Sequence, residues 1–157
     1  MKEVNEKDFD CEKETNHLQV TMMAKPENEK LARNLVASFL LDLNPSVEEI
    51  SDIKTVISEA VTNSIVHGYN KGSGDIIIDA KLFGNRLVLK VIDNGVGIAD
   101  IKKAMQPFFT TRPEEERSGM GFTVMETFMD KVEVESVNPH GVCVTLTKQI
   151  LSAEKGV

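Results

Sequence analysis

The sequence predicts an α+β fold, a two-layer sandwich in which helices cover one face of a mixed β-sheet. The first observation is the order of the apolar patterns, which read strand, two helices, two strands, long loop, helix and two strands. The second is that strands and helices do not alternate one by one, so a parallel doubly wound sheet is not expected. With 157 residues, 41% of them hydrophobic, the chain suits one domain with a single core.

The predicted domain spans residues 16–150, between a charged lead-in (1–15) and a short tail (151–157). The lead-in lacks the apolar core of a signal peptide, and no window approaches ~18 consecutive apolar residues. We therefore expect a cytoplasmic protein without a membrane segment. The net charge of −7 argues against a nucleic-acid partner, because binding phosphates requires clustered Lys and Arg. Cys11 and Cys143 have no His or Cys at ligand spacing, so neither indicates a metal site.

The first half of the domain is expected to form one strand and two helices. Apolar alternation over 17–24 predicts the strand. Pro26 opens a helix whose apolar residues recur at helical spacing, until a Pro-containing break ends it. Ser46 and Glu49 have the spacing of a capping box, which marks the start of the second helix, and this helix should end near Gly68.

The second half combines two hairpins with a long irregular stretch over 99–121. Loops of this length in compact domains are usually lids, binding loops or disordered segments. The regular elements expected here are strands 75–82 and 85–93, helix 122–129, and strands 131–137 and 141–150.

A polar stripe runs along the second helix. Glu59, Asn63 and His67 are four residues apart, so they share one side of a helix that is otherwise mostly apolar. Such a stripe is either a solvent face or the wall of a site. In a site, the Asn63 oxygen could bind Mg²⁺ and the Glu59 carboxylate could accept a proton from an attacking hydroxyl or water. His67 fits a structural role at the helix end better than a catalytic one.

A glycine turn follows the strand 85–93. Asp93 offers a carboxylate that could accept a hydrogen bond from the exocyclic amine of adenine. Gly95 and Gly97 lack a Cβ atom, so the backbone could approach a flat ring or turn sharply. The alternative is an ordinary hairpin-like turn. Neither a GxGxxG pattern nor a GxxxxGK[ST] phosphate loop is present.

Glycines also precede the helix 122–129. Gly119 and Gly121 would let backbone N–H groups at a helix start surround phosphate oxygens, and Arg117 could add a positive charge. A glycine hinge with a helix cap is the alternative. In the preceding stretch, Thr110 and Thr111 could face a nucleotide, or this loop could simply make one hydrophobic contact.

Taken in order, EAVTNSIVHG, DNGVG and GMGF resemble the N, G1 and G2 boxes of the GHKL ATPase superfamily. That superfamily includes gyrase-type ATPases and histidine kinase catalytic domains, and the resemblance covers roughly residues 17–150. The short length and the segment QPFFTTRPEEERSGMGFTVMETFMD resemble the anti-sigma serine kinases of spore-forming bacteria. The resemblance implies a GHKL-type fold, ATP and Mg²⁺ as cofactors, and a homodimer.

The resemblance also implies roles for individual residues. Glu59 would be the general base on a substrate serine, Asn63 the Mg²⁺ ligand, and Asp93 the residue that binds the adenine amine. Gly95 and Gly97 would shape the adenine pocket, and residues 99–118 would form the ATP lid. Further nucleotide contacts are expected from Thr110, Thr111, Arg117, Ser118, Gly119, Met120 and Gly121. Arg33 on the first helix would contact a protein partner.

The implied function is that of an anti-sigma factor with protein-serine kinase activity. It would sequester a sigma factor, with sporulation sigma F as the expected one, and phosphorylate a serine of an anti-anti-sigma protein. One alternative is a non-catalytic, ATP-dependent sigma-factor-binding module, and another is an anti-sigma kinase of a stress regulon. A detached histidine kinase domain is disfavoured, because no histidine lies in a long dimerisation helix. The chain departs from the family at Gly141-Val142, where Gly-Thr is common, so altered adenine contacts are expected.

Overall fold

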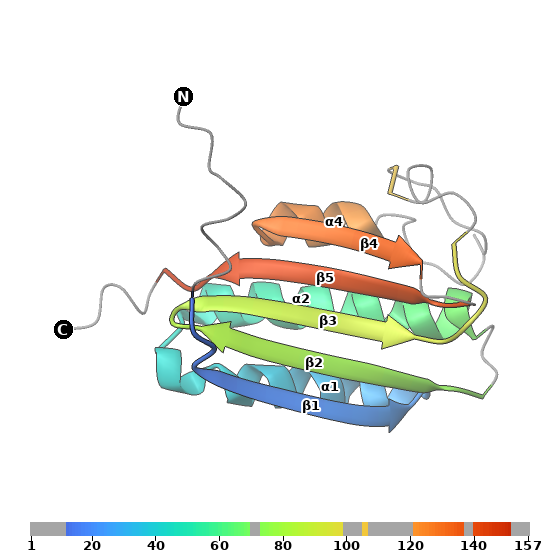
Figure 1. Ribbon diagram of the computed structural model, residues 1–157, viewed down its shortest axis with the longest axis horizontal. Coiled ribbons are helices and arrows are strands. Elements are labelled where there is room, and N and C mark those ends of the chain that lie inside the picture. Colours follow the sequence, from blue (N-terminus) through green and yellow to red (C-terminus); the bar gives the residue numbers. More distant parts are fainter. Residues whose placement is uncertain (1–11, 70–72, 99–104, 107–120, 137–139, 152–157) are drawn as a thin grey trace.

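The computed structural model describes residues 12–69, 73–98, 105–106, 121–136 and 140–151. In this part of the chain, a five-stranded sheet carries its helices on one face (Figure 1). The helices are α1 (Pro26–Phe39), α2 (Val47–Asn63) and α4 (Gly121–Phe128). α2 lies in the middle of the helix layer and packs against both α1 and α4. This arrangement confirms the predicted α+β two-layer sandwich.

The strands are ordered β1-β2-β3-β5-β4 across the sheet. Their bounds are β1 (Asn16–Met23), β2 (Asp75–Phe83), β3 (Arg86–Asp93), β4 (Lys131–Ser136) and β5 (Val142–Gln149). All four neighbouring pairs are antiparallel, so the expected mixed sheet is wrong for the described strands. Two helices lie between β1 and β2, and the three reversals at β1–α1, α1–α2 and α2–β2 make β2 run opposite to β1. β5 inserts between β3 and β4, which separates the two strands that a single helix connects.

The predicted second helix begins as its sequence indicates. Glu49 donates its backbone N–H to Ser46 Oγ at 3.0 Å, and its side chain accepts the Ser46 N–H at 2.9 Å. The same carboxylate accepts the Leu151 N–H at 2.8 Å, which ties the end of the last strand to the start of α2. The helix continues into one π-helical turn, Ser64–Gly68, and so ends where the sequence predicts. No helix among the described residues combines the length and the apolar character needed to cross a membrane.

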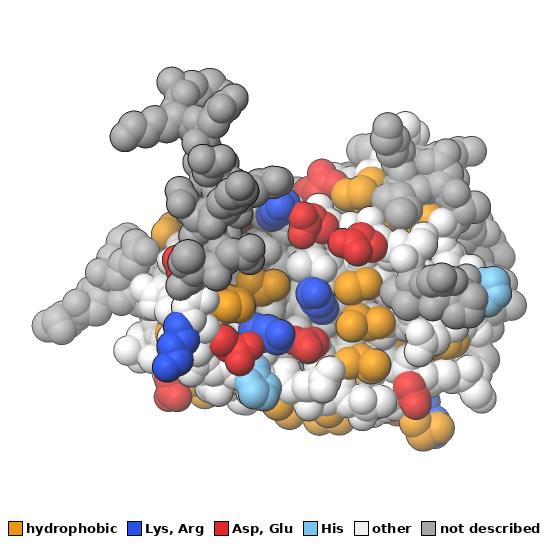
Figure 2. Space-filling view, viewed as in Figure 1, with side chains coloured by type: hydrophobic (Ala, Val, Ile, Leu, Met, Phe, Trp, Pro, Cys, Tyr) orange, Lys and Arg blue, Asp and Glu red, His pale blue; other side chains and the backbone are white. Residues whose placement is uncertain are grey.

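The core lies between the sheet and the helices. Alternate residues of β2 are buried beneath the helices, and α2 adds apolar residues at helical spacing. The fully buried residues with the largest side chains include Leu40, Ile53, Ile57, Ile76, Ile78, Leu87, Leu89, Met125 and Leu146. On the opposite, open face of the sheet, a short hydrophobic band lies among charged side chains (Figure 2). The strand register places Ile77, Ile92 and Cys143 in one row across that face.

Candidate functional site

Three of the predicted motifs meet at one end of the sandwich. This is the end at which α2 passes into its π-helical turn, β3 ends and α4 begins. A Cβ atom on Gly121, the first residue of α4, would lie 3.2 Å from Asn63 Nδ2 and 3.3 Å from Glu59 Oε2. A Cβ atom on Gly68 would lie 3.1 Å from Asp93 Oδ1. The fold therefore brings together residues that are far apart in the sequence.

Glu59 and Asn63 form the wall that faces the start of α4. Both side chains are partly exposed, and Gly121 is buried against them. Any side chain at Gly121 would press on these polar groups, so the glycine allows α4 to begin close to the stripe. The first N–H groups of a helix lack partners within the helix, and they create a site suited to anions. Two residues of the predicted polar stripe, Glu59 and Asn63, therefore line the candidate site.

Asp93 is the buried acidic group of the site, with 4% of its surface exposed. Its Oδ2 accepts a hydrogen bond from Ser64 Oγ at 2.9 Å, and its Oδ1 accepts one from the Gly95 N–H at 3.0 Å. Burial raises the pKa of Asp93 above its ordinary value, while hydrogen bonds from Gly95, Ser64 and the Val142 backbone act in the opposite direction. The result is a carboxylate in a fixed orientation that still has lone pairs for a further donor.

The turn after β3 packs directly on the end of the π-helical turn. A Cβ atom on Gly95 would lie 2.1 Å from the Gly68 carbonyl oxygen, a distance that no side chain tolerates. The Val96 N–H donates to the same oxygen at 2.9 Å. Gly97 has a φ of +81°, a left-handed conformation that favours glycine. The sequence assigned both glycines to a ligand pocket, and the structure adds that Gly95 is required by the protein's own backbone.

Two further residues of the site, Ser64 and Tyr69, were missed in the sequence. Ser64 holds the Asp93 carboxylate, as described above. Tyr69 Oη donates to the Asp75 carbonyl oxygen at 2.6 Å and accepts the Asn94 N–H at 2.7 Å. The signal for them was weak, because it consisted only of polar residues within and just after a helix that was already assigned.

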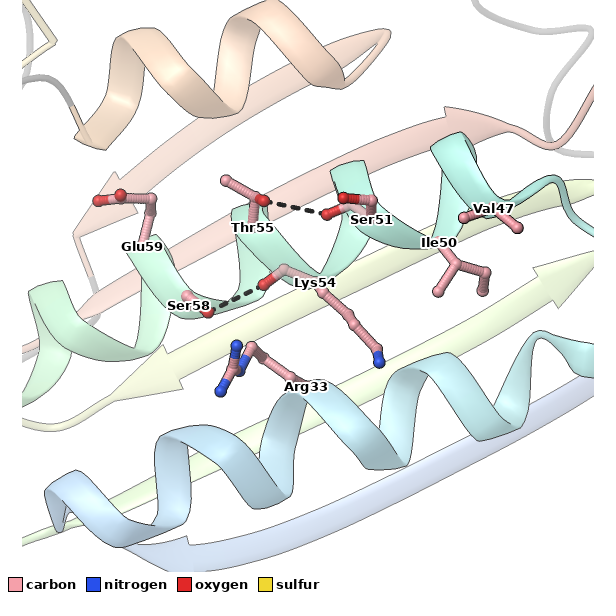
Figure 3. A pocket seen from close by; sticks show the side chains of 8 residues that line it. All are labelled: Arg33, Val47, Ile50, Ser51, Lys54, Thr55, Ser58 and Glu59. Atoms are coloured by element: carbon pink, nitrogen blue, oxygen red, sulfur yellow. Dashed lines mark hydrogen bonds between the residues drawn. The ribbon is translucent and has the colours of Figure 1, made fainter.

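A groove between α1 and α2 extends from the site. It has a volume of about 430 Å³ and is lined by Arg33, Val47, Ile50, Ser51, Lys54, Thr55, Ser58 and Glu59. Figure 3 shows Arg33 reaching from α1 and Lys54 from α2 into the space between the helices, with Glu59 at one end. The Thr55 and Ser58 hydroxyls donate to backbone carbonyls one turn earlier, at 3.0 Å each. The predicted partner contact, Arg33, thus shares a groove with Glu59.

Several predicted residues lie outside the described part of the chain. They are Thr110, Thr111, Arg117, Ser118, Gly119 and Met120, together with most of the expected lid, 99–118. Among the described residues, no group of three or more His, Cys, Asp and Glu side chains could hold a metal ion.

Comparison with known proteins first defines the class. Residues 22–148 match the family model of the histidine kinase-like ATPase domain, so the chain belongs to the GHKL-type ATPase superfamily. The fold is similar to the RsbU and RsbW domains of Rv1364c from Mycobacterium tuberculosis, with a TM-score of 0.61 and 22% identity. That match covers 87% of this chain and 32% of the other. The catalytic domain of the histidine kinase ThkA gives a TM-score of 0.55 at 17% identity, covering 87% of this chain and 97% of that one. Both likenesses concern the fold alone.

Curated relatives then define the family. The chain is 56% identical over 136 residues to the anti-sigma F factor of Thermoanaerobacter pseudethanolicus, a match that covers 87% of this chain and 95% of that protein. It is 53% identical to the anti-sigma F factor of Caldanaerobacter subterraneus subsp. tengcongensis, covering 86% and 94% of the two chains. It is 50% identical to that of Clostridium kluyveri, covering 85% and 94%. The chain belongs to the anti-sigma F factor family.

Proposed function

We propose that this chain is an ATP-dependent protein-serine kinase that also sequesters a sigma factor. It would bind Mg-ATP, hold the sporulation sigma factor sigma F, and phosphorylate a serine of an anti-anti-sigma protein. We further propose that it works as a cytoplasmic homodimer. The observation that carries the kinase proposal is the approach of Glu59 and Asn63 to the first residue of α4. This places a carboxylate and a hard-oxygen ligand together at a helix start suited to phosphate.

Each part of the nucleotide would have a matching group in the chain. The Asp93 carboxylate would accept the adenine amine through a lone pair that Ser64, Gly95 and the Val142 backbone leave unused. Val142 lies opposite Asp93 in the strand register, so a threonine hydroxyl is missing beside the carboxylate. The Asn63 oxygen would bind Mg²⁺, which neutralises phosphate charge when bound. Backbone N–H groups at the start of α4 would contact the phosphates.

In this mechanism Glu59 takes the proton of the attacking serine hydroxyl. Its carboxylate lies beside Gly121, and the residue also lines one end of the α1–α2 groove. A segment of the partner lying in this groove would bring its hydroxyl to Glu59, and Arg33 and Lys54 on the groove walls would contact that segment. Phosphoryl transfer is accelerated mainly by positioning and charge neutralisation. The general base contributes about 10²–10⁴-fold.

Replacing Glu59 by Gln tests this role. The variant should bind Mg-ATP as the wild type does, because the amide has nearly the shape of the carboxylate, while phosphate transfer to the anti-anti-sigma partner falls by about 10²–10⁴-fold. The matched control is Glu48→Gln, which makes the same chemical change in the exposed first turn of α2. Transfer by Glu59→Gln at near wild-type rate, measured with γ-labelled ATP, would show that Glu59 is not the base.

A second candidate is a sigma-binding module without transferase activity. It is supported by the names of the relatives, which are called anti-sigma F factors. Such a module would bind the sigma factor in a nucleotide-dependent way, yet transfer no label from γ-labelled ATP to any partner. Co-purification with ATP, followed by mapping of phosphorylated serines, distinguishes the two functions.

A further inference from the structure

Tyr69 lies where three segments of the candidate site meet. It directly follows the π-helical turn Ser64–Gly68, and its hydroxyl bonds to the first residue of β2 and to the turn after β3. It is also the only tyrosine of the chain, which has no tryptophan. Nothing in the proposed mechanism uses this side chain. Its contacts nevertheless concern the turn that carries the adenine-binding residues.

The hydroxyl group of Tyr69 is fully engaged as a bridge. It donates to the Asp75 carbonyl oxygen at 2.6 Å and accepts the Asn94 N–H at 2.7 Å. The ring packs against Gly74, where a Cβ atom would lie only 2.2 Å from a ring carbon. Asn94 follows Asp93 in the chain, so holding its N–H fixes the peptide plane next to the buried carboxylate. The bridge thus joins the start of one strand to the end of its neighbour.

The same segment holds the turn at two other points. Ser64, at the start of the π-helical turn, donates to the Asp93 carboxylate, and its own carbonyl accepts the Tyr69 N–H at 3.0 Å. Gly68 accepts the Val96 N–H at 2.9 Å. Single π-helical turns within α-helices are often found at functional sites. Here the turn begins directly after Asn63, so the proposed metal ligand and the adenine-binding turn are linked through five residues.

We propose that Tyr69 is a positioning residue for adenine: its hydroxyl bridge sets the direction in which the Asp93 carboxylate and the Gly95 backbone meet the base. This inference deepens the proposed function and rests only on its nucleotide-binding part. The phenol suits the task because it donates and accepts at once, which a phenylalanine ring cannot do. Burial, with the neighbouring carboxylates of Asp93 and Asp75, raises the pKa of the phenol against the lowering effect of the Asn94 hydrogen bond. The Tyr69 hydroxyl therefore keeps its proton and can donate the hydrogen bond of the bridge.

The test compares ATP with GTP. Guanine lacks the exocyclic amine that adenine would present to Asp93, so GTP affinity should depend little on the orientation of the Asp93 carboxylate. For Tyr69→Phe in the full-length chain, we expect ATP affinity to fall about tenfold and GTP affinity to change by less than about twofold. The matched control is Thr127→Val, which removes a hydroxyl bonded within α4. Titration calorimetry with both nucleotides in the presence of Mg²⁺ gives the ratio of ATP affinity to GTP affinity directly.

The outcomes separate this inference from the proposed function. An unchanged ratio of ATP to GTP affinity in Tyr69→Phe, or equal losses for both nucleotides, overturns the positioning role. A loss of ATP affinity in Asp93→Asn with none in Tyr69→Phe also overturns it, while the nucleotide site stands. If the wild type binds no nucleotide, the proposed function itself fails. Should Tyr69→Phe not fold, hydrogen exchange of the wild type decides, because the bridge requires a protected Asn94 amide and rapid exchange there excludes it.

Discussion

Replacement of Asp93 by Asn should separate nucleotide affinity from folding stability. The residue is buried, and its carboxylate already accepts hydrogen bonds from Ser64, from the Gly95 N–H and from the Val142 backbone. Asparagine keeps the shape but replaces one acceptor oxygen by an amide that donates, so the adenine amine loses its partner. A hydrogen bond to a charged acceptor contributes about 1.5–3 kcal/mol. The affinity for Mg-ATP should therefore fall about 10- to 150-fold.

The stability of the same variant should change little. Burial raises the pKa of Asp93, which means that the folded state disfavours the ionised form. Asparagine removes that penalty, and the Ser64 hydroxyl can accept from the new amide after it rotates. We expect the free energy of unfolding at neutral pH to stay within about 1 kcal/mol of the wild type. Such a result would indicate that the Asp93 carboxylate serves nucleotide binding and does not increase the stability of the fold.

The pH dependence follows from the direction of the pKa shift. The folded state binds a proton at Asp93 more readily than the unfolded chain, so wild-type stability from this group rises as the pH falls from above the raised pKa to below 3.8. The Asn variant lacks this contribution. Urea unfolding of both proteins across that window should therefore show their difference moving in favour of the wild type at acid pH. At neutral pH, the ionised wild-type carboxylate carries the full burial penalty.

Calorimetric titration with Mg-ATP and urea unfolding complete the assay. Asp79→Asn is the matched control, because Asp79 lies on β2 in the alternate positions that face the open side of the sheet. If Asp93→Asn binds Mg-ATP as tightly as this control, the carboxylate does not recognise adenine. If it instead loses several kcal/mol of stability while its remaining folded fraction binds ATP normally, the role of Asp93 is structural.

Three further predictions concern other parts of the site. Asn63→Ala should lose the Mg²⁺-dependent part of ATP affinity while metal-free ATP binding persists, and equal affinity with and without Mg²⁺ in wild type and variant would exclude this ligand. Gly95→Ala should lower both thermal stability and ATP affinity, because its Cβ would lie 2.1 Å from the Gly68 oxygen; a melting temperature equal to wild type would contradict that packing. Lys54→Glu should weaken binding of the phosphoacceptor partner most at low salt and leave ATP affinity unchanged, as surface plasmon resonance at two ionic strengths can measure.

Most regular elements could be predicted because local and long-range signals agree in this chain. The Ser46–Glu49 capping box fixes the start of α2, and both of its hydrogen bonds are present. The strands of the two hairpins alternate apolar and polar residues, and their register buries one face of the sheet. β2 and β3 lie within one residue of the predicted ranges. Elements defined by periodicity need no knowledge of the tertiary fold.

The pairing of distant segments could not be predicted in the same way. The sequence gives no local sign that β5 lies between β3 and β4, and this order makes the described sheet fully antiparallel. The hydrogen bond from Ser64 to Asp93 spans 29 positions, and that from Asn94 to Tyr69 spans 25. No repeating pattern in the sequence marks the residues of either hydrogen bond as partners. The π-helical turn that places Ser64 and Tyr69 also has no signature in the residue types.

The choice of asparagine at position 63 follows from its neighbour. Glu59 Oε2 and both side-chain heteroatoms of Asn63 lie within 3.3 Å of the same point, the Cβ position of Gly121. An aspartate at position 63 would bring a second negative charge beside Glu59, which would raise the pKa of one carboxyl group and hold a proton on it whenever the metal is absent. A neutral amide oxygen can bind Mg²⁺ without competing for that proton. In a chain of net charge −7, a neutral ligand also avoids further repulsion of a triphosphate. In the proposed function, the pair would combine a metal ligand with a general base.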